Sequence, residues 1–200
     1  MLVAFVGTVN DESDTPISGN GKTCSMTGYG YLDYLSGKHI WSNYKTTFSE
    51  KVCGLQEMIE TIGDERHPDT KLMISEMQKI LNSIGSSYNQ ILFIDSFCSQ
   101  LRKLDVDMYY DTQRFNNCHL RLRVHTDVVL VPYKTHIDNS PCNYNLCKKP
   151  HKIYIYSHKP YFKTARKCFD ASIVGELYDT NEYILDQLII PDKKKVKAGL

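Results

Sequence analysis

The sequence predicts an α/β fold with a mostly parallel central sheet. Short apolar strands alternate with helical stretches along the chain, which is the pattern of repeated β–α units. The opening segment, residues 2–6, is apolar at every position, as strands buried in a parallel sheet are. The chain has 200 residues, which is long enough for one domain with a sizeable core.

Composition narrows the class of protein. Charged residues make up 24% of the chain and hydrophobic residues 42%, which is ordinary for a globular protein. The net charge of +1 gives no overall basic field of the kind that marks nucleic-acid binding, although a ring-shaped motor can gather basic groups at its pore. No apolar run approaches the roughly 20 residues of a membrane span. The apolar segment at residues 2–6 is not preceded by the basic residues that open a secretory signal peptide. The seven cysteines therefore indicate reduced thiols, and we expect a cytoplasmic protein that is not itself transmembrane.

A glycine-rich segment follows the first strand and indicates phosphate binding. Gly-Asn-Gly-Lys-Thr, residues 19–23, stands where a strand gives way to a helix, which is the layout of a P-loop. In such a loop backbone N–H groups surround the phosphates, the lysine reaches the β- and γ-phosphates, and the threonine hydroxyl binds Mg²⁺. The predicted nucleotide-binding residues are Gly19, Asn20, Gly21, Lys22, Thr23 and Cys24.

The loop departs from the usual pattern before residue 19. A P-loop places a glycine five residues ahead of its Gly-Lys-Thr, and Pro16 occupies that position here. The intervening loop, residues 8–18, carries Asp11, Glu12 and Asp14. These carboxylates would repel a triphosphate unless they point outward or meet a metal ion. An acidic surface loop followed by a chance match is therefore the alternative interpretation.

The other elements are predicted from periodicity and flanking residues. Two stretches are alternatives for an acidic strand: residues 71–76, ending in Glu76, and residues 90–95, ending in Asp95. The apolar spacing over 88–103 suits one helix entered at Ser86-Ser87. The predicted strands are residues 2–6, 39–45, 71–76, 106–110, 127–131 closed by Pro132, and 152–156; the predicted helices are residues 22–35, from Ser49 to 62, 88–103 and 116–123.

The composition of the chain changes after residue 133, where proline, asparagine, cysteine and histidine become frequent. We expect a P-loop ATPase core over residues 1–133, a small appendage or hairpin inserted on it over 134–170, and a C-terminal segment over 171–200 with a basic tail. The appendage is rich in potential zinc ligands. Cys142, Cys147 and His151 would supply three, with His136 or His158 as a fourth. Because this spacing is not that of a usual zinc turn, the sequence favours a loop without metal.

The order of these motifs resembles the P-loop ATPases of the FtsK/HerA superfamily, and most of all the small members from archaeal viruses and plasmids, which are related to packaging ATPases and Zot-like proteins. The resemblance covers most of the chain outside residues 8–18 and 134–170. It implies a three-layer RecA/ASCE-like fold. The segments that carry it are Gln100–Phe115, Arg121–Arg123, Thr126–Pro132, Leu177–Glu182 and Ser42–Lys45.

The resemblance also implies roles for individual residues. The family's acidic pair at the strand end is Ser75-Glu76 here, which leaves Asp95 inside the following helix. Ser75 stands where an aspartate normally holds Mg²⁺ through water, and Glu76 keeps the position of the base that activates the attacking water. Gln113 would sense the γ-phosphate or orient that water. The candidates for an arginine finger that reaches a neighbouring subunit are Arg102, Arg121 and Arg123.

The function implied is an ATP- and Mg²⁺-dependent DNA translocase or packaging motor, which hydrolyses ATP to ADP and phosphate. Its partners would be the backbone of double-stranded DNA, other copies in a hexameric ring, and a capsid or membrane-associated protein, in the host cytoplasm if the protein is viral. Two alternatives remain. One is a degenerate P-loop scaffold with weak or no hydrolysis, favoured by the stretched loop and Ser75. The other is a zinc-stabilised nucleic-acid-binding module.

Overall fold

The computed structural model describes residues 1–8, 19–64, 67–82, 84, 86–142, 147–158 and 167–179. The acidic loop from residue 9 to 18 and the basic tail therefore lie outside the described residues, as does the end of the segment Leu177–Glu182.

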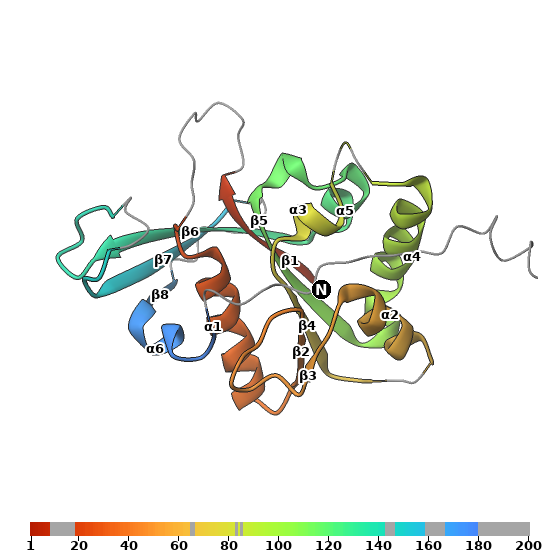
Figure 1. Ribbon diagram of the computed structural model, residues 1–200, viewed down its shortest axis with the longest axis horizontal. Helices are drawn as coiled ribbons and strands as arrows, with labels where there is room; N and C mark the ends of the chain where they lie inside the picture. Colours follow the sequence, from red (N-terminus) through yellow and green to blue (C-terminus); the bar gives the residue numbers. More distant parts are fainter. Residues whose placement is uncertain are drawn as a thin grey trace, which may run out of the picture.

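One eight-stranded sheet organises the described chain, in the order β3-β2-β4-β5-β1-β6-β7-β8 (Figure 1). The pairs from β3 to β6 are parallel, and β7 and β8 continue the sheet antiparallel. The described part of residues 134–170 thus belongs to the same sheet. The strands are β1 (Leu2–Thr8), β2 (His39–Ser42), β3 (Lys51–Val52), β4 (Thr70–Ile74), β5 (Val106–Arg114), β6 (Val128–His136), β7 (His151–Ser157) and β8 (Lys167–Asp170).

Helices cover both faces of the sheet, so the molecule has three layers (Figure 1). The face that carries Leu2, Ala4 and Val6 of β1 packs against α2, α4 and α5. The face that carries Val3 and Phe5 packs against α1 and α6. Successive side chains of a strand point to opposite faces, and a strand that is apolar throughout is therefore buried on both. The helices are α1 (Lys22–Leu35), α2 (Leu55–Asp64), α3 (Met77–Ile80), α4 (Tyr88–Leu104), α5 (Leu120–His125) and α6 (Ala171–Gly175), with a 3₁₀ turn η1 (Phe115–Asn117).

The two long helices confirm the predictions made from their ends. Helix α1 begins at Lys22 and ends at Leu35, as predicted. Its Gly30 has a packing reason, since a Cβ there would lie 2.1 Å from the sulfur of Met73 in β4. Helix α4 begins with a capping box in which Ser87 and Gln90 satisfy each other's backbone N–H groups. Asp95 lies within α4, so the choice of residues 71–76 as the acidic strand is confirmed.

Several predicted boundaries were wrong. Residues 39–45 form only the short β2, and the helix expected from Ser49 begins at Leu55 after β3. The helix expected over 116–123 is divided into η1 and α5. Pro132 does not end its strand, because β6 continues to His136. Pro132 lies beyond Leu130, the last residue of β6 that pairs with β1, and its carbonyl accepts a hydrogen bond from Asn20 on that side. The nitrogen and the carbonyl of a strand residue point to the same side. The missing N–H therefore faces away from β7, and the pairing of β6 with β7 continues.

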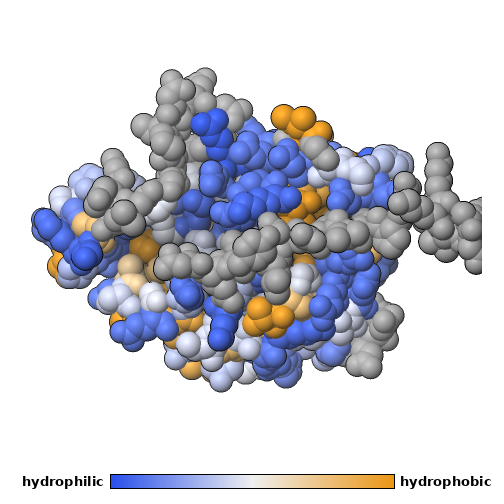
Figure 2. Space-filling model, in the orientation of Figure 1, coloured by the Kyte–Doolittle hydropathy of each residue, from blue (hydrophilic) through white to orange (hydrophobic). Residues whose placement is uncertain are grey.

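Within the described ranges no helix combines the length and the apolar character needed to cross a bilayer. The face of the molecule in Figure 2 is mainly hydrophilic, with apolar groups in small separate patches.

Candidate nucleotide-binding site

The glycine-rich loop enters α1 through two residues in the left-handed region. Gly19 has a φ of 78° and Gly21 a φ of 90°, conformations that other residues adopt only at a cost. Gly21 is the N-cap of α1, which has 14 residues, and no side chain caps this end. The first N–H groups of the helix therefore face the loop and are donors for an anion.

Asn20 fixes this loop to the sheet. Its side-chain amide donates to the carbonyl oxygens of Gly7, in β1, and of Pro132, in β6, at 3.4 Å each. Its carbonyl oxygen accepts from Lys22 Nζ at 3.2 Å. The loop thus lies over the carboxyl end of β1 and the middle of β6, and Lys22 is held close to it.

A carboxylate from β5 occupies the centre of the site. Asp111 is 2% exposed, and its Oδ2 accepts a hydrogen bond of 2.6 Å from the Thr23 hydroxyl. The same oxygen accepts one of 3.0 Å from the Ser75 hydroxyl, and Oδ1 accepts one of 2.7 Å from the backbone N–H of Glu76. Asp111 therefore joins the start of α1 to the end of β4.

The position of Ser75 is fixed in turn by Asn43, which is fully buried after β2. The Asn43 amide donates to the Ser75 carbonyl at 3.0 Å, and its oxygen accepts from the Ser75 N–H at 2.7 Å. Carboxyl ends of neighbouring parallel strands meet at one edge of a sheet. The network at this edge connects β2, β4, β5 and α1 in sequence.

Burial changes the pKa of both central charged groups. It raises the pKa of Asp111 above the ordinary aspartate value, against the opposing effects of the bonds from Thr23 and Glu76 and of the Lys22 charge. It also lowers the pKa of Lys22, while the carboxylates of Asp111 and Glu76 act in the opposite direction. Burial thus acts against the charged form of both groups.

Glu76, Gln113 and Cys24 lie around this network. Glu76 has a left-handed backbone, φ 56°, at the N-cap of α3, and its carboxylate forms an ion pair with Lys79. Gln113 is exposed near the end of β5. It is two residues after Asp111, so the two side chains lie on the same face of the sheet. Cys24 is buried in the first turn of α1, where burial raises the pKa of its thiol to about 12. Its side chain is therefore a packing group.

The three arginines have neighbours outside the loop. Arg121 pairs with Asp95 of α4 at 3.1 Å, and Arg123 donates to the Asn116 side chain at 2.7 Å. Arg102 lines a cavity of about 700 Å³ with Met1 and Leu2, at the amino end of β1. Arg102 is thus at the amino ends of the strands, whereas Lys22 is at their carboxyl ends.

The side chains present fit a magnesium–nucleotide pair. Mg²⁺ prefers hard oxygen ligands, and the Thr23 hydroxyl and the Asp111 carboxylate share one hydrogen bond at the loop. The loop N–H groups and Lys22 supply donors and positive charge for phosphates.

Sequence reasoning placed Asp111 at the end of a strand and gave it no role. The signal was present: an acidic residue near the carboxyl end of one strand, and Ser75 where an acidic residue was expected on another. Recognising it requires the knowledge that β4 and β5 are neighbours, which the sheet provides, with Ile74 paired to Tyr110.

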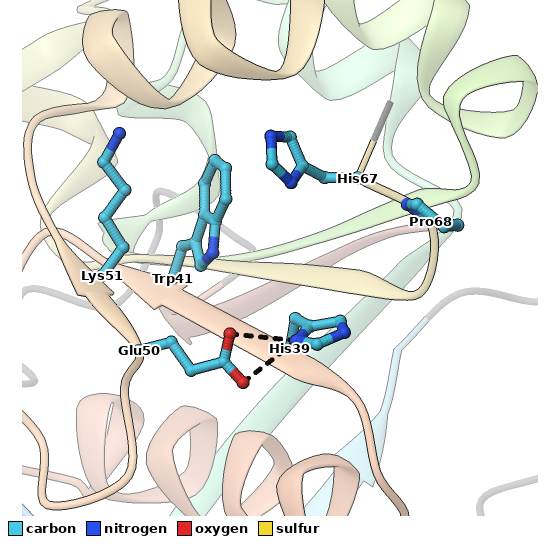
Figure 3. Close-up of a pocket in the computed structure, with 6 residues that line it drawn as sticks. All are labelled: His39, Trp41, Glu50, Lys51, His67 and Pro68. Atoms are coloured by element: carbon cyan, nitrogen blue, oxygen red, sulfur yellow. Dashed lines mark hydrogen bonds and ion pairs between the residues drawn. The ribbon is translucent and has the colours of Figure 1, made fainter. Parts of the chain in front are cut away.

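A separate cavity of about 420 Å³ lies at the β2–β3 edge of the sheet (Figure 3). His39 Nδ1 forms a hydrogen bond of 2.9 Å with the Glu50 carboxylate there, while Trp41 lies between Lys51 and His67. His39 starts β2, and Pro68 precedes β4, so this cavity is at the amino ends of the strands. It is therefore distinct from the nucleotide-binding site.

No family model matches the sequence, and no curated protein is significantly similar to it. Solved structures do match. The N-terminal domain of zonular occludens toxin from Neisseria meningitidis has a TM-score of 0.53 and 14% identity, over 89% of this chain and 98% of that domain. A KaiC-like protein from Pyrococcus horikoshii has a TM-score of 0.50 and 11% identity, over 84% of this chain and 83% of that one.

A third structure is the genome packaging NTPase B204 of Sulfolobus turreted icosahedral virus 2 with ATP-gammaS, at a TM-score of 0.49, 12% identity, and 80% and 98% coverage of this chain and that one. At such identities likeness shows the fold alone. The predicted α/β fold of P-loop NTPases is confirmed, and so is the resemblance stated from the sequence, as a likeness of fold.

Proposed function

We propose that the chain is a P-loop ATPase that moves DNA for a virus or another mobile element. The observation that carries this proposal is the meeting of Lys22, Thr23, Asp111 and Glu76 at one edge of the sheet, beneath a glycine-rich helix start. Such a site supplies the charge and the donors that phosphoryl transfer to water requires.

Each residue has a proposed task. Lys22 neutralises charge on the β- and γ-phosphates, and the first N–H groups of α1 bind phosphate oxygens. Thr23 and Asp111 hold Mg²⁺, with Ser75 orienting the carboxylate through its 3.0 Å bond. When bound, Mg²⁺ supplies further neutralisation of developing phosphate charge.

Water activation is assigned to Glu76 and Gln113. Glu76 accepts a proton from the attacking water, and Gln113 orients that water or senses the γ-phosphate. The products are ADP and phosphate. In its own subunit the Glu76 carboxylate pairs with Lys79, so it must turn from that partner toward the water.

The arginines would act in trans in a ring of copies. Arg102 lies at the amino ends of the strands, away from the loop, and Arg121 and Arg123 contact Asp95 and Asn116 within their own chain. An arginine finger from a neighbour makes hydrolysis depend on assembly. The resemblance favours a hexamer, with the backbone of double-stranded DNA bound through phosphate contacts independent of base sequence.

The test of this function is ATP hydrolysis by the Lys22→Ala variant, with and without double-stranded DNA. We expect turnover to fall to background, and the melting temperature without nucleotide to be retained, because burial disfavours the charged lysine in the folded state. Lys38→Ala is the matched control, since Lys38 pairs with Asp69 at the surface. Unchanged turnover in Lys22→Ala would refute the proposal.

A second candidate function is a nucleotide-free or non-hydrolysing scaffold, favoured by Ser75 in place of the usual aspartate. Asp111 argues against it, because a carboxylate reaches the Thr23 hydroxyl from the next strand. A wild-type protein that binds no ATP in the presence of Mg²⁺ would favour the scaffold.

A further inference from the structure

Four potential metal ligands meet at the end of the β6–β7 hairpin, away from the nucleotide-binding site. His136 is the last residue of β6 and His151 the first of β7, and the two are paired in register. Cys142 and Cys147 belong to the connection between them. The ligand atoms of all four side chains lie within 4.8 Å of one another.

The separations within this cluster are close to those of a small tetrahedral site. His151 Nε2 lies 3.1 Å from Cys142 Sγ, and His136 Nε2 lies 3.4 Å from Cys147 Sγ. Bond lengths of about 2.3 Å to sulfur and 2.0 Å to nitrogen give neighbouring tetrahedral ligands a separation of about 3.3–3.8 Å. One ion at the centre is thus within reach of all four atoms after small adjustments.

The hydrogen bonds behind the cluster fix the tautomer of His136. The Ser140 hydroxyl donates to Asp138 at 2.7 Å, and the same hydroxyl lies 2.9 Å from His136 Nδ1. Because its proton is given to Asp138, the Ser140 oxygen accepts from Nδ1–H. The lone pair of His136 is therefore on Nε2, the atom that faces Cys147, as in histidines that bind a metal and are oriented by an outer hydrogen bond.

The geometry points to a structural Zn²⁺ site formed by His136, Cys142, Cys147 and His151. Two thiolates balance the charge of the ion, and four protein ligands fill a tetrahedral shell with no open position for a substrate, which is typical of structural zinc. Cys142 and His151 are 6% and 8% exposed.

The site would fasten a hairpin that supports the glycine-rich loop. Pro132, in β6, accepts the hydrogen bond from Asn20, and Ile153, in β7, packs where a Cβ of Gly21 would lie, 2.6 Å from its Cδ1. In Figure 1 the hairpin lies at the end of the molecule opposite α4. Zinc would close its free end and hold this support in place.

The test is the metal content of the full chain, purified from zinc-supplemented medium without chelator. We expect about one zinc per chain in the wild type, and a large loss of zinc in Cys142→Ser and Cys147→Ser. The controls are Cys168→Ser and His158→Ala, which change an exposed cysteine on β8 and an exposed histidine after β7. Both controls should keep one zinc per chain.

Cobalt replacement gives a second reading that does not depend on ligand-removal variants. Co²⁺ added to the metal-free chain should give the intense visible bands of a tetrahedral thiolate site. His136→Cys should retain zinc and strengthen the thiolate-to-cobalt absorption, because a third thiolate replaces an imidazole. Less than a tenth of a zinc per wild-type chain, or equal loss in Cys168→Ser and Cys142→Ser, would overturn the proposal. Neither reading requires nucleotide, so the result is independent of ATP hydrolysis.

Discussion

Asp111 is the residue on which the electrostatics of the site depend. Its carboxylate accepts hydrogen bonds from Thr23, Ser75 and the Glu76 backbone while almost fully buried. A neutral amide of the same shape can keep this arrangement: its oxygen accepts from Glu76 N–H, and its NH₂ donates to the two hydroxyls. Asp111→Asn therefore separates the charge of the residue from its packing.

This separation predicts a pH-dependent stability difference. Because burial raises the folded-state pKa of Asp111, its stability contribution is full below the unfolded pKa and is lost as pH rises through the folded pKa. Without nucleotide or Mg²⁺, the melting temperature of Asp111→Asn relative to wild type should rise from acidic to neutral pH. A change of about 1 kcal/mol corresponds to roughly 2–4 °C in a chain of this size.

The matched control is Asp105→Asn, at the exposed C-cap of α4. Asp105 has a left-handed φ of 56°, which asparagine also tolerates. The difference from wild type should rise more steeply with pH for Asp111→Asn than for Asp105→Asn, because Asp111 is almost fully buried and Asp105 is exposed. A flat curve for Asp111→Asn would show that the buried carboxylate does not titrate as described.

The sequence predicted the site residues that belong to one contiguous motif. It did not predict the role of a residue whose partners are distant in sequence and meet only in the folded sheet. Lys22 and Thr23 follow glycines in a recognisable order, so the sequence placed them at a helix start, which is confirmed. The role of Asp111 depends on which strands are neighbours, because its partners Ser75 and Glu76 follow β4, the strand next to β5. The sequence already grouped His136 with His151 as possible zinc ligands, but their pairing across two strands comes from the sheet.

At the scale of elements, local signals predicted helices better than strand ends. The ends of α1 and α4 carry glycine and capping-box signals that act through nearby backbone groups. The extension of β6 past Pro132 depends on pairing with β7, which the proline leaves intact because its missing N–H faces away from that strand. Strands at the border of a sheet are thus decided by partners far along the chain.

The capping box of α4 gives a prediction at this scale. Ser87→Ala removes the acceptor of the Gln90 N–H, which lies 3.3 Å from Ser87 Oγ. We expect a loss of about 1 kcal/mol in the free energy of unfolding, measured by urea denaturation. Ser99→Ala, at an exposed position of the same helix, is the control and should change stability much less. Equal losses in the two variants would contradict the role of the cap.

At the scale of the molecule, the sheet order explains how one site is assembled from separate motifs. β5 lies between β1, which precedes the loop, and β4, which ends just before Ser75. A carboxylate on β5 therefore lies between the two, and it can substitute for one missing from β4 without any change in the backbone. The central claim is that Asp111 supplies the magnesium-binding carboxylate of an ATP site.

Calorimetry of ATP binding tests this claim most directly, with and without Mg²⁺, on wild type, Asp111→Asn and the Asp105→Asn control. We predict that Mg²⁺ strengthens ATP binding by wild type and by the control. Asp111→Asn should lose roughly ten- to a hundredfold in affinity for Mg²⁺-ATP, the equivalent of about 1.5–3 kcal/mol for a bond to a charged group. Its affinity for ATP without Mg²⁺ should change little. The same magnesium dependence in Asp111→Asn and wild type would contradict the account.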